Sequence, residues 1–173
     1  MSVTARNLTF GFIGLLCAAW MGFGRWAFGL GGELTWWYAP LIALPFAVLQ
    51  LWTLQRVNVA VRRGREPGRA PYGALVLSWV CALGFGLTVP DLVDGELVSI
   101  AGRFGGEIWN EMAIALCNPF GIIAFATAIA ALAFAYAAGR ERRLSEDELL
   151  DAAEAAGAVD GTGMVRHPLS RED

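Results

Sequence analysis

Glu107, Glu111 and Asn118 are the residues whose chemical types and spacing best suit contact with a ligand or solute. On an α-helix that turns by about 100° per residue, the three positions fall within about 40° of one another and form one polar stripe. Two carboxylates one turn apart, with an amide two turns farther on, are candidate contacts for a cation or solute. The alternative is structural: the glutamates are the solvated face of a helix leaving a membrane, and Asn118 bonds a neighbouring helix beside Pro119.

Most other chemistries lack the residues that they need. The only histidine, His167, lies in a polar tail, and Cys17, Cys81 and Cys117 fall one to an apolar run without a C-x-x-C pair. No phosphate-binding glycine motif and no nucleophile elbow is present in the sequence. We therefore predict no catalytic residues, no metal site and no cofactor, and we expect a protein that is not an enzyme.

The composition is that of a membrane protein. Of 173 residues, 56% are hydrophobic and only 17% are charged, with a mean hydropathy of +0.50. The charges lie almost entirely between or outside four apolar runs, each long enough to cross a bilayer core of about 30 Å. We predict an all-α, four-helix transmembrane bundle over residues 1–139, and the predicted spans are residues 8–30, 34–54, 72–89 and 112–138.

The first apolar run has an alternative interpretation as a cleaved signal peptide, because a basic lead with Arg6 precedes it. The sequence lacks the small-residue cleavage pattern, and the apolar character continues beyond any cut, which favours a membrane span. Arg25 lies near the end of this run beside Trp26. We expect its guanidinium to reach the lipid headgroups, and the sequence leaves open a partner such as Glu33.

The distribution of arginine predicts the orientation. Short loops rich in arginine stay on the cytoplasmic side of a membrane, and the loop after the second run carries five arginines against one acid. We therefore expect a multi-pass protein of the cytoplasmic (inner) membrane with both termini in the cytoplasm. The residues predicted to set this topology are Arg56, Arg62, Arg63, Arg65, Arg69, Arg140, Arg142 and Arg143.

The segment between the third and fourth runs is acidic, as expected of an outer loop. Its apolar residues recur at helical spacing and predict a short extracytoplasmic amphipathic helix on the membrane surface. These residues are Leu97, Ile100, Ala101, Phe104 and Ile108. Glycines at positions 102, 105 and 106 predict a break before the last span.

Small residues at helical spacing predict close contacts between helices, because association in lipid depends on packing. The candidates are Gly73, Ala82, Gly86, Ala124, Ala128 and Ala131. Residues 140–173 are predicted to be an acidic cytoplasmic tail, with a short helix at about 146–156 followed by disorder.

Two functions remain open at this point. We favour a non-catalytic accessory or assembly subunit that packs against a larger membrane complex, because catalytic groups are lacking and small-residue faces are present. The alternative is an oligomeric pore or transporter for a small solute, including a phage-type pore or exclusion protein, with Glu107, Glu111 and Asn118 at its mouth. The expected partners are the lipid bilayer and other membrane subunits or further copies of the chain, and no nucleic acid.

Overall fold

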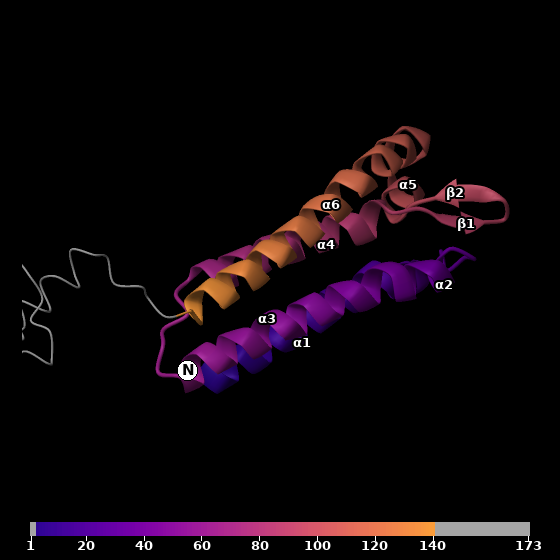
Figure 1. Ribbon diagram of the computed structural model, residues 1–173. Helices are drawn as coiled ribbons and strands as arrows, with labels where there is room; N and C mark the ends of the chain where they lie inside the picture. Colours follow the sequence, from indigo (N-terminus) through magenta and orange to yellow (C-terminus); the bar gives the residue numbers. More distant parts are fainter. Residues whose placement is uncertain (1–2, 141–173) are drawn as a thin grey trace, which may run out of the picture. The chain divides into compact units, whose positions relative to one another are not determined.

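The computed structural model describes residues 3–140, and it confirms a mostly helical chain, with 80% of these residues in helices (Figure 1). Among these described residues, four helices are long and apolar enough to span a membrane: Ala5–Phe28, Thr35–Arg62, Ala70–Thr88 and Glu107–Ala138. The second helix ends later than predicted, so Arg56 and Arg62 lie on a helix and not in a loop. The predictions for Arg142, Arg143 and a helix at 146–156 lie outside the described residues.

Within residues 3–140, ten elements follow one another. They are α1 (Val3–Phe23), the 3-10 helix η1 (Gly24–Phe28), α2 (Thr35–Tyr38), the π-helix η2 (Ala39–Ala43), α3 (Leu44–Arg62), α4 (Ala70–Thr88), β1 (Asp91–Val93), β2 (Glu96–Val98), α5 (Ile100–Gly105) and α6 (Glu107–Ala138). The π-helical turn joins α2 to α3 without a gap. Pro40 lies within it and Pro45 is the second residue of α3, and proline removes the backbone donor that a regular α-helix requires.

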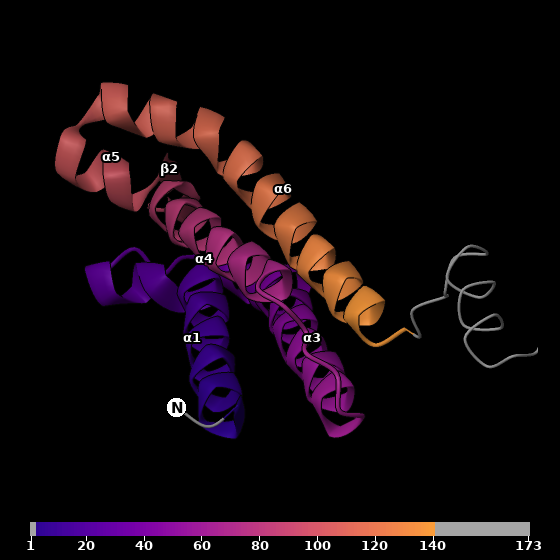
Figure 2. The ribbon, with the colours of Figure 1, turned by 90° about the vertical axis from the view of Figure 1, so that its left-hand side faces the viewer.

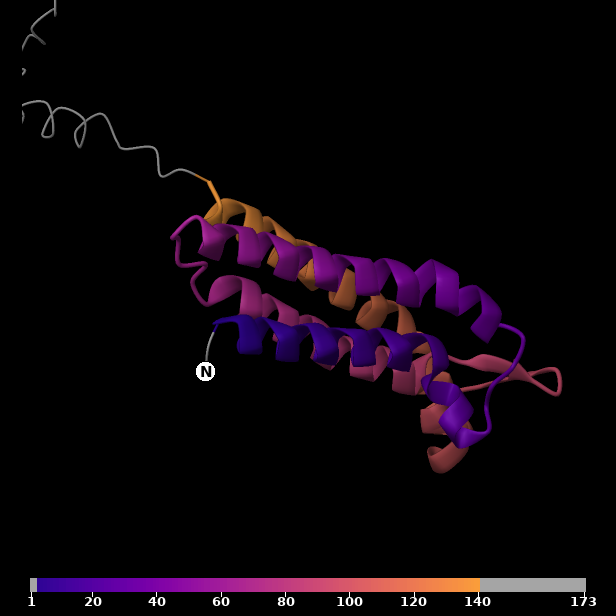
Figure 3. The same cartoon turned by 90° about the horizontal axis from the view of Figure 1, so that it is seen from below.

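Helix α6 packs most extensively against α4 and next against α3, and α1 packs against both α3 and α4. Figure 2 shows that α6 is curved, and Pro119 lies inside it, where it interrupts the backbone hydrogen bonds. Figure 3 shows the start of α1, the loop between α3 and α4, and the end of α6 together at one end, which we call the arginine-rich end after Arg6, Arg62, Arg63, Arg65 and Arg69. The loop 29–34 and the strands β1 and β2 lie at the other end, the hairpin end.

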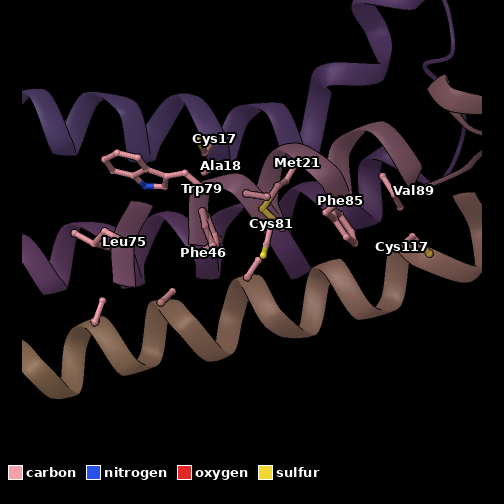
Figure 4. Packing of buried hydrophobic residues seen from close by; sticks show 14 of the residues in the cluster. Cys17, Ala18, Met21, Phe46, Leu75, Trp79, Cys81, Phe85, Val89 and Cys117 are labelled. Atoms are coloured by element: carbon pink, nitrogen blue, oxygen red, sulfur yellow. The ribbon is translucent and has the colours of Figure 1, made fainter. Parts of the chain in front are cut away.

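Side chains from all four long helices meet in a single core (Figure 4). Its members are Cys17, Ala18 and Met21 of α1, Phe46 and Leu54 of α3, Leu75, Trp79, Cys81, Ala82 and Phe85 of α4, and Cys117, Ala124, Ala128 and Ala131 of α6, with Val89 after α4. The contact between α4 and α6 is close because each helix places a glycine against a ring of the other. A Cβ on Gly84 would lie 2.8 Å from the Phe120 ring, and one on Gly121 would lie 3.1 Å from the Phe85 ring.

The residues predicted at helix contacts fall into two groups. Five are buried: Ala82, Gly86, Ala124, Ala128 and Ala131. Gly86 accommodates the Trp20 indole, which a Cβ at this position would overlap. Gly73 is exposed, and no atom lies within 4 Å of a Cβ built on it, so no described residue packs against the position that its side chain would occupy.

The connection from α4 to α6 differs from the single amphipathic helix that we predicted. It contains an antiparallel hairpin of β1 and β2, in which Leu92 pairs with Leu97, followed by the six-residue helix α5. Asp94 and Gly95 form the turn with φ values of 51° and 86°, and Asp-Gly favours such a turn because both residues tolerate positive φ. Gly106, at φ 83°, separates α5 from α6, so the break lies where the glycines predicted it.

Candidate functional site

Arg25 and Asp91 form a buried ion pair at the hairpin end. The Arg25 Nε and the Asp91 Oδ2 atoms are 3.4 Å apart, and the side chains are only 1% and 0% exposed. The prediction that Arg25 reaches the headgroups is therefore wrong. Withdrawing two charges from solvent is costly, and the compensation here is uneven. Several donors satisfy the Asp91 carboxylate, whereas the Nε and Nη1 atoms of Arg25 are buried without a hydrogen-bond partner among the described residues.

The Asp91 carboxylate gathers donors from two connections of the chain. Its Oδ1 accepts hydrogen bonds from the backbone N–H groups of Leu34, at 2.9 Å, and Leu92, at 2.8 Å, and its Oδ2 accepts one from the Thr35 hydroxyl. Burial alone would raise the pKa of Asp91, but the donors from Thr35, Leu92, Leu34 and Gly32 outweigh it and lower the pKa below its usual value. The carboxylate is therefore ionised at neutral pH.

Arg25 is held by the end of its own helix and by Tyr38. Its Nη2 donates to the Gly22 carbonyl at 3.1 Å, and its guanidinium carbon lies 4.5 Å from the centre of the Tyr38 ring, in a cation–π contact. The Tyr38 hydroxyl donates to the Pro90 carbonyl. These contacts fasten η1, α2 and the start of β1 together, so the ion pair is an anchor for the hairpin end and not a reactive centre.

The predicted polar stripe lies on the outside of the bundle. Glu107, Glu111 and Asn118 are all exposed along α6, and neither glutamate forms an ion pair with a described residue. Of these three residues, only Asn118 lines a groove of about 500 Å³. The groove is also lined by Ile42, Phe85 and Phe125. The structure thus separates the amide from the two carboxylates, which lie outside this groove.

The side chain of Asn118 is the one amide in an otherwise apolar groove lining. Its Oδ1 receives only a long contact of 4.0 Å from the Cys117 sulfur, and its N–H groups donate to no described residue. A carboxamide left without partners in an apolar environment is unfavourable. This amide is therefore suited to a hydrogen bond with a group outside the chain.

Sequence reasoning missed a polar cluster in the core. Gln50 of α3 is 1% exposed and bridges two residues of α4: its Nε2 donates to the Ser78 hydroxyl at 3.1 Å, and its Oε1 accepts from the Trp79 indole at 2.9 Å. Gly14 of α1 leaves room for it, because a Cβ there would lie 3.1 Å from the Gln50 side chain. Both the oxygen and the nitrogen of the Gln50 amide therefore have a partner on α4. The cluster stabilises helix packing and offers no open ligand site.

Replacing Gln50 with leucine is expected to lower the free energy of unfolding by about 1 kcal/mol, the usual scale for interhelical hydrogen bonds in membranes. The Trp79 N–H loses its acceptor, while the apolar area is kept. The measurement is equilibrium unfolding in detergent. Gln55→Leu is the matched control, because Gln55 lies on the same helix but is exposed, and equal losses in the two variants would contradict the role of the cluster.

The residues predicted to set topology differ in their surroundings. Arg56 packs over the Tyr136 ring at 4.0 Å, and Arg65 donates to the Gly139 carbonyl, so both tie α6 to the arginine-rich end. The exposed members are Arg62, Arg63, Arg69 and Arg140. Arg6, Asn7, Asn58 and Tyr72 add a network between α1, α3 and α4, in which the Tyr72 hydroxyl donates to Asn7 at 2.8 Å.

No family model, curated protein or solved structure matches the chain. Within residues 3–140, no group of three or more His, Cys, Asp or Glu side chains could hold a metal ion. The geometry that bears on function therefore consists of the anchored hairpin end, the closed polar core and the groove that contains Asn118.

Proposed function

We propose that the protein is a non-catalytic integral membrane subunit that packs against other subunits of a larger membrane complex, with the groove around Asn118 as its contact surface. Its four long helices cross the cytoplasmic membrane, and both ends of the chain lie in the cytoplasm. Support for this orientation comes from charge: exposed arginines gather at one end, while Asp94, Glu96, Glu107 and Glu111 are exposed at the other.

The observation that carries the proposal is the free amide of Asn118 within the apolar groove. The surrounding face of α6 is apolar and outward, since Ile122 is 69% exposed and Ile129 is 55% exposed. Lipid tails satisfy such apolar side chains equally well, but they cannot satisfy an amide. A membrane helix with small residues and one polar side chain would fill the groove and complete the hydrogen bonding of Asn118.

The test is purification of the full chain from its native membrane in mild detergent, with mass spectrometry of co-purifying chains. We expect a stoichiometric larger partner, and we expect Asn118→Leu to reduce its recovery about tenfold, the effect of losing roughly 1–2 kcal/mol. The leucine keeps the apolar surface and removes the amide.

The matched control for Asn118→Leu is Thr127→Val on the same helix. The Thr127 hydroxyl already donates to the Ile123 carbonyl at 2.7 Å, so its removal frees no group for a partner, and recovery should stay unchanged. A lone monomer in the native extract, or equal recovery with the two variants, would refute the proposed contact.

An oligomeric pore for a small solute is the second candidate. It is favoured by Glu107 and Glu111, which are exposed on α6 with no counter-ion among the described residues. Met21, Phe46 and Leu75 fill the interior of the bundle, so a solute path would have to run between copies of the chain. A homo-oligomer without other subunits in the same purification, together with solute flux in liposomes, would favour the pore over the assembly role.

A further inference from the structure

A second groove runs between α1 and α3. It has a volume of about 640 Å³ and is apolar along one part, where Phe12, Leu15 and Leu51 form its walls. Gly11 deepens it, because it lines the groove without a side chain. The groove continues to the arginine-rich end, where the character of its lining changes.

Hydrogen-bond donors gather at that end of the groove. Gln55, Asn58 and Arg62 line it, and all three are exposed. The side chains of Gln55 and Arg62 bond no described residue, and Asn58 uses its amide oxygen to accept from Asn7, which leaves its N–H groups available. The lining includes no Asp or Glu, so this end suits an anion.

The groove also has the length of one leaflet of a bilayer. Leu51 and Arg62 are separated along α3 by about 16 Å at roughly 1.5 Å per residue. Half of a hydrocarbon core of about 30 Å is nearly the same distance. A ligand with an anionic group at Arg62, polar linking groups near Gln55 and an apolar chain beyond them would match the lining from end to end.

We propose that this groove binds one phospholipid with an anionic headgroup. The phosphate accepts hydrogen bonds from Arg62 and Asn58, Gln55 lies about 10 Å from Arg62 along the helix and donates to an ester oxygen of the lipid, and an acyl chain lies along Phe12, Leu15 and Leu51. Basic residues between membrane helices on the cytoplasmic side are a recurrent setting for such headgroups. Free phosphate would use only the polar end, and an apolar partner helix would leave the guanidinium unpaired.

This inference goes beyond the assembly role, and its test uses the isolated full chain, so failure of one does not imply failure of the other. The purified protein in dodecyl maltoside is mixed with dioleoylphosphatidylglycerol or dioleoylphosphatidylcholine, and retained lipid is counted by native mass spectrometry. We expect one phosphatidylglycerol to be retained with about tenfold preference. Inorganic phosphate at the same concentration should not displace it.

Arg62→Gln should reduce that preference to within about twofold, because the charge-assisted hydrogen bond is lost. The control is Arg63→Gln, which removes an adjacent exposed charge that does not line the groove and should keep the preference. Gly11→Leu fills the apolar part and should release the lipid without changing charge. Equal retention of the two lipids, equal losses in the Arg62 and Arg63 variants, or displacement by phosphate would overturn the proposal.

Discussion

Replacing Asp91 with asparagine is expected to lower the free energy of unfolding by about 3–5 kcal/mol, the largest effect predicted for this protein. The Asp91 side chain is 0% exposed and faces the guanidinium of Arg25, which is also buried. The variant leaves this positive charge without its counter-ion. It also replaces one acceptor oxygen by an amide donor among groups that themselves donate, including the Thr35 hydroxyl.

Equilibrium unfolding in detergent measures this loss, and Asp94→Asn is the matched control. Asp94 lies in the same hairpin but is exposed, so its variant should stay within about 0.5 kcal/mol of the unmodified protein. A double variant, Arg25→Met with Asp91→Asn, should recover part of the loss, because no buried charge then lacks its counter-ion while the amide oxygen can still accept from the N–H groups of Leu34 and Leu92. Similar losses for Asp91→Asn and Asp94→Asn would show that the pair is not an anchor.

The same carboxylate gives the protein a pH dependence with a defined sign. The pKa of Asp91 is lower in the folded state than its usual value of about 3.9, so folding favours the ionised form. This stabilisation is fully present above the usual pKa, and it is lost as the pH falls through the lower folded value. The free energy of unfolding, measured in detergent, should therefore fall below about pH 4. In the Asp91→Asn variant it should fall less over the same pH range.

The four apolar helices could be predicted because hydropathy is a local property of the sequence. The hairpin was also signalled locally, since Asp94 and Gly95 are a typical two-residue turn. The prediction rested on the helical spacing of Leu97, Ile100 and Phe104 and did not consider this turn. The error arose because Ser99 accepts the hydrogen bond that starts α5, so the helix begins after Leu97.

The partners of Arg25 and Gln50 could not be predicted in the same way. Both bonds join residues that are far apart in the sequence, and the hairpin end offers several acids besides Asp91. Asp91, and not another acid, pairs with Arg25 because the folded loops direct their hydrogen-bond donors at this one carboxylate. Gln50 lies inside an apolar run, where a hydropathy average conceals a single amide.

The outward position of Asn118 follows from its angular position around α6 relative to the buried alanines. Positions 118 and 124 differ by about 120° around a helix that turns about 100° per residue. Once Ala124 and the alanines that follow it are buried against α4, Asn118 must lie beside that contact and not within it. The sequence contained this relation, but only the packing of α6 shows which face is covered.

Replacing Ala128 with leucine is expected to cost about 1–3 kcal/mol, the second largest effect among the substitutions proposed. Ala124, Ala128, Ala131 and Ala135 form a buried seam on α6 with exposed fractions of 0–1%, and α6 packs against both α4 and α3. Close approach leaves no space for three further carbon atoms, so the helices must separate or the side chain must leave its preferred rotamer.

The control for the seam is Ala133→Leu, which adds the same volume to an exposed position of the same helix. Since leucine and alanine both favour helices, intrinsic propensity changes little in either variant. Equilibrium unfolding in detergent should show the loss for Ala128→Leu alone. Because lipid supplies no hydrophobic drive between helices, unchanged stability in both variants would mean that α6 is held by its polar contacts, such as Arg65 with Gly139, and not by the alanine seam.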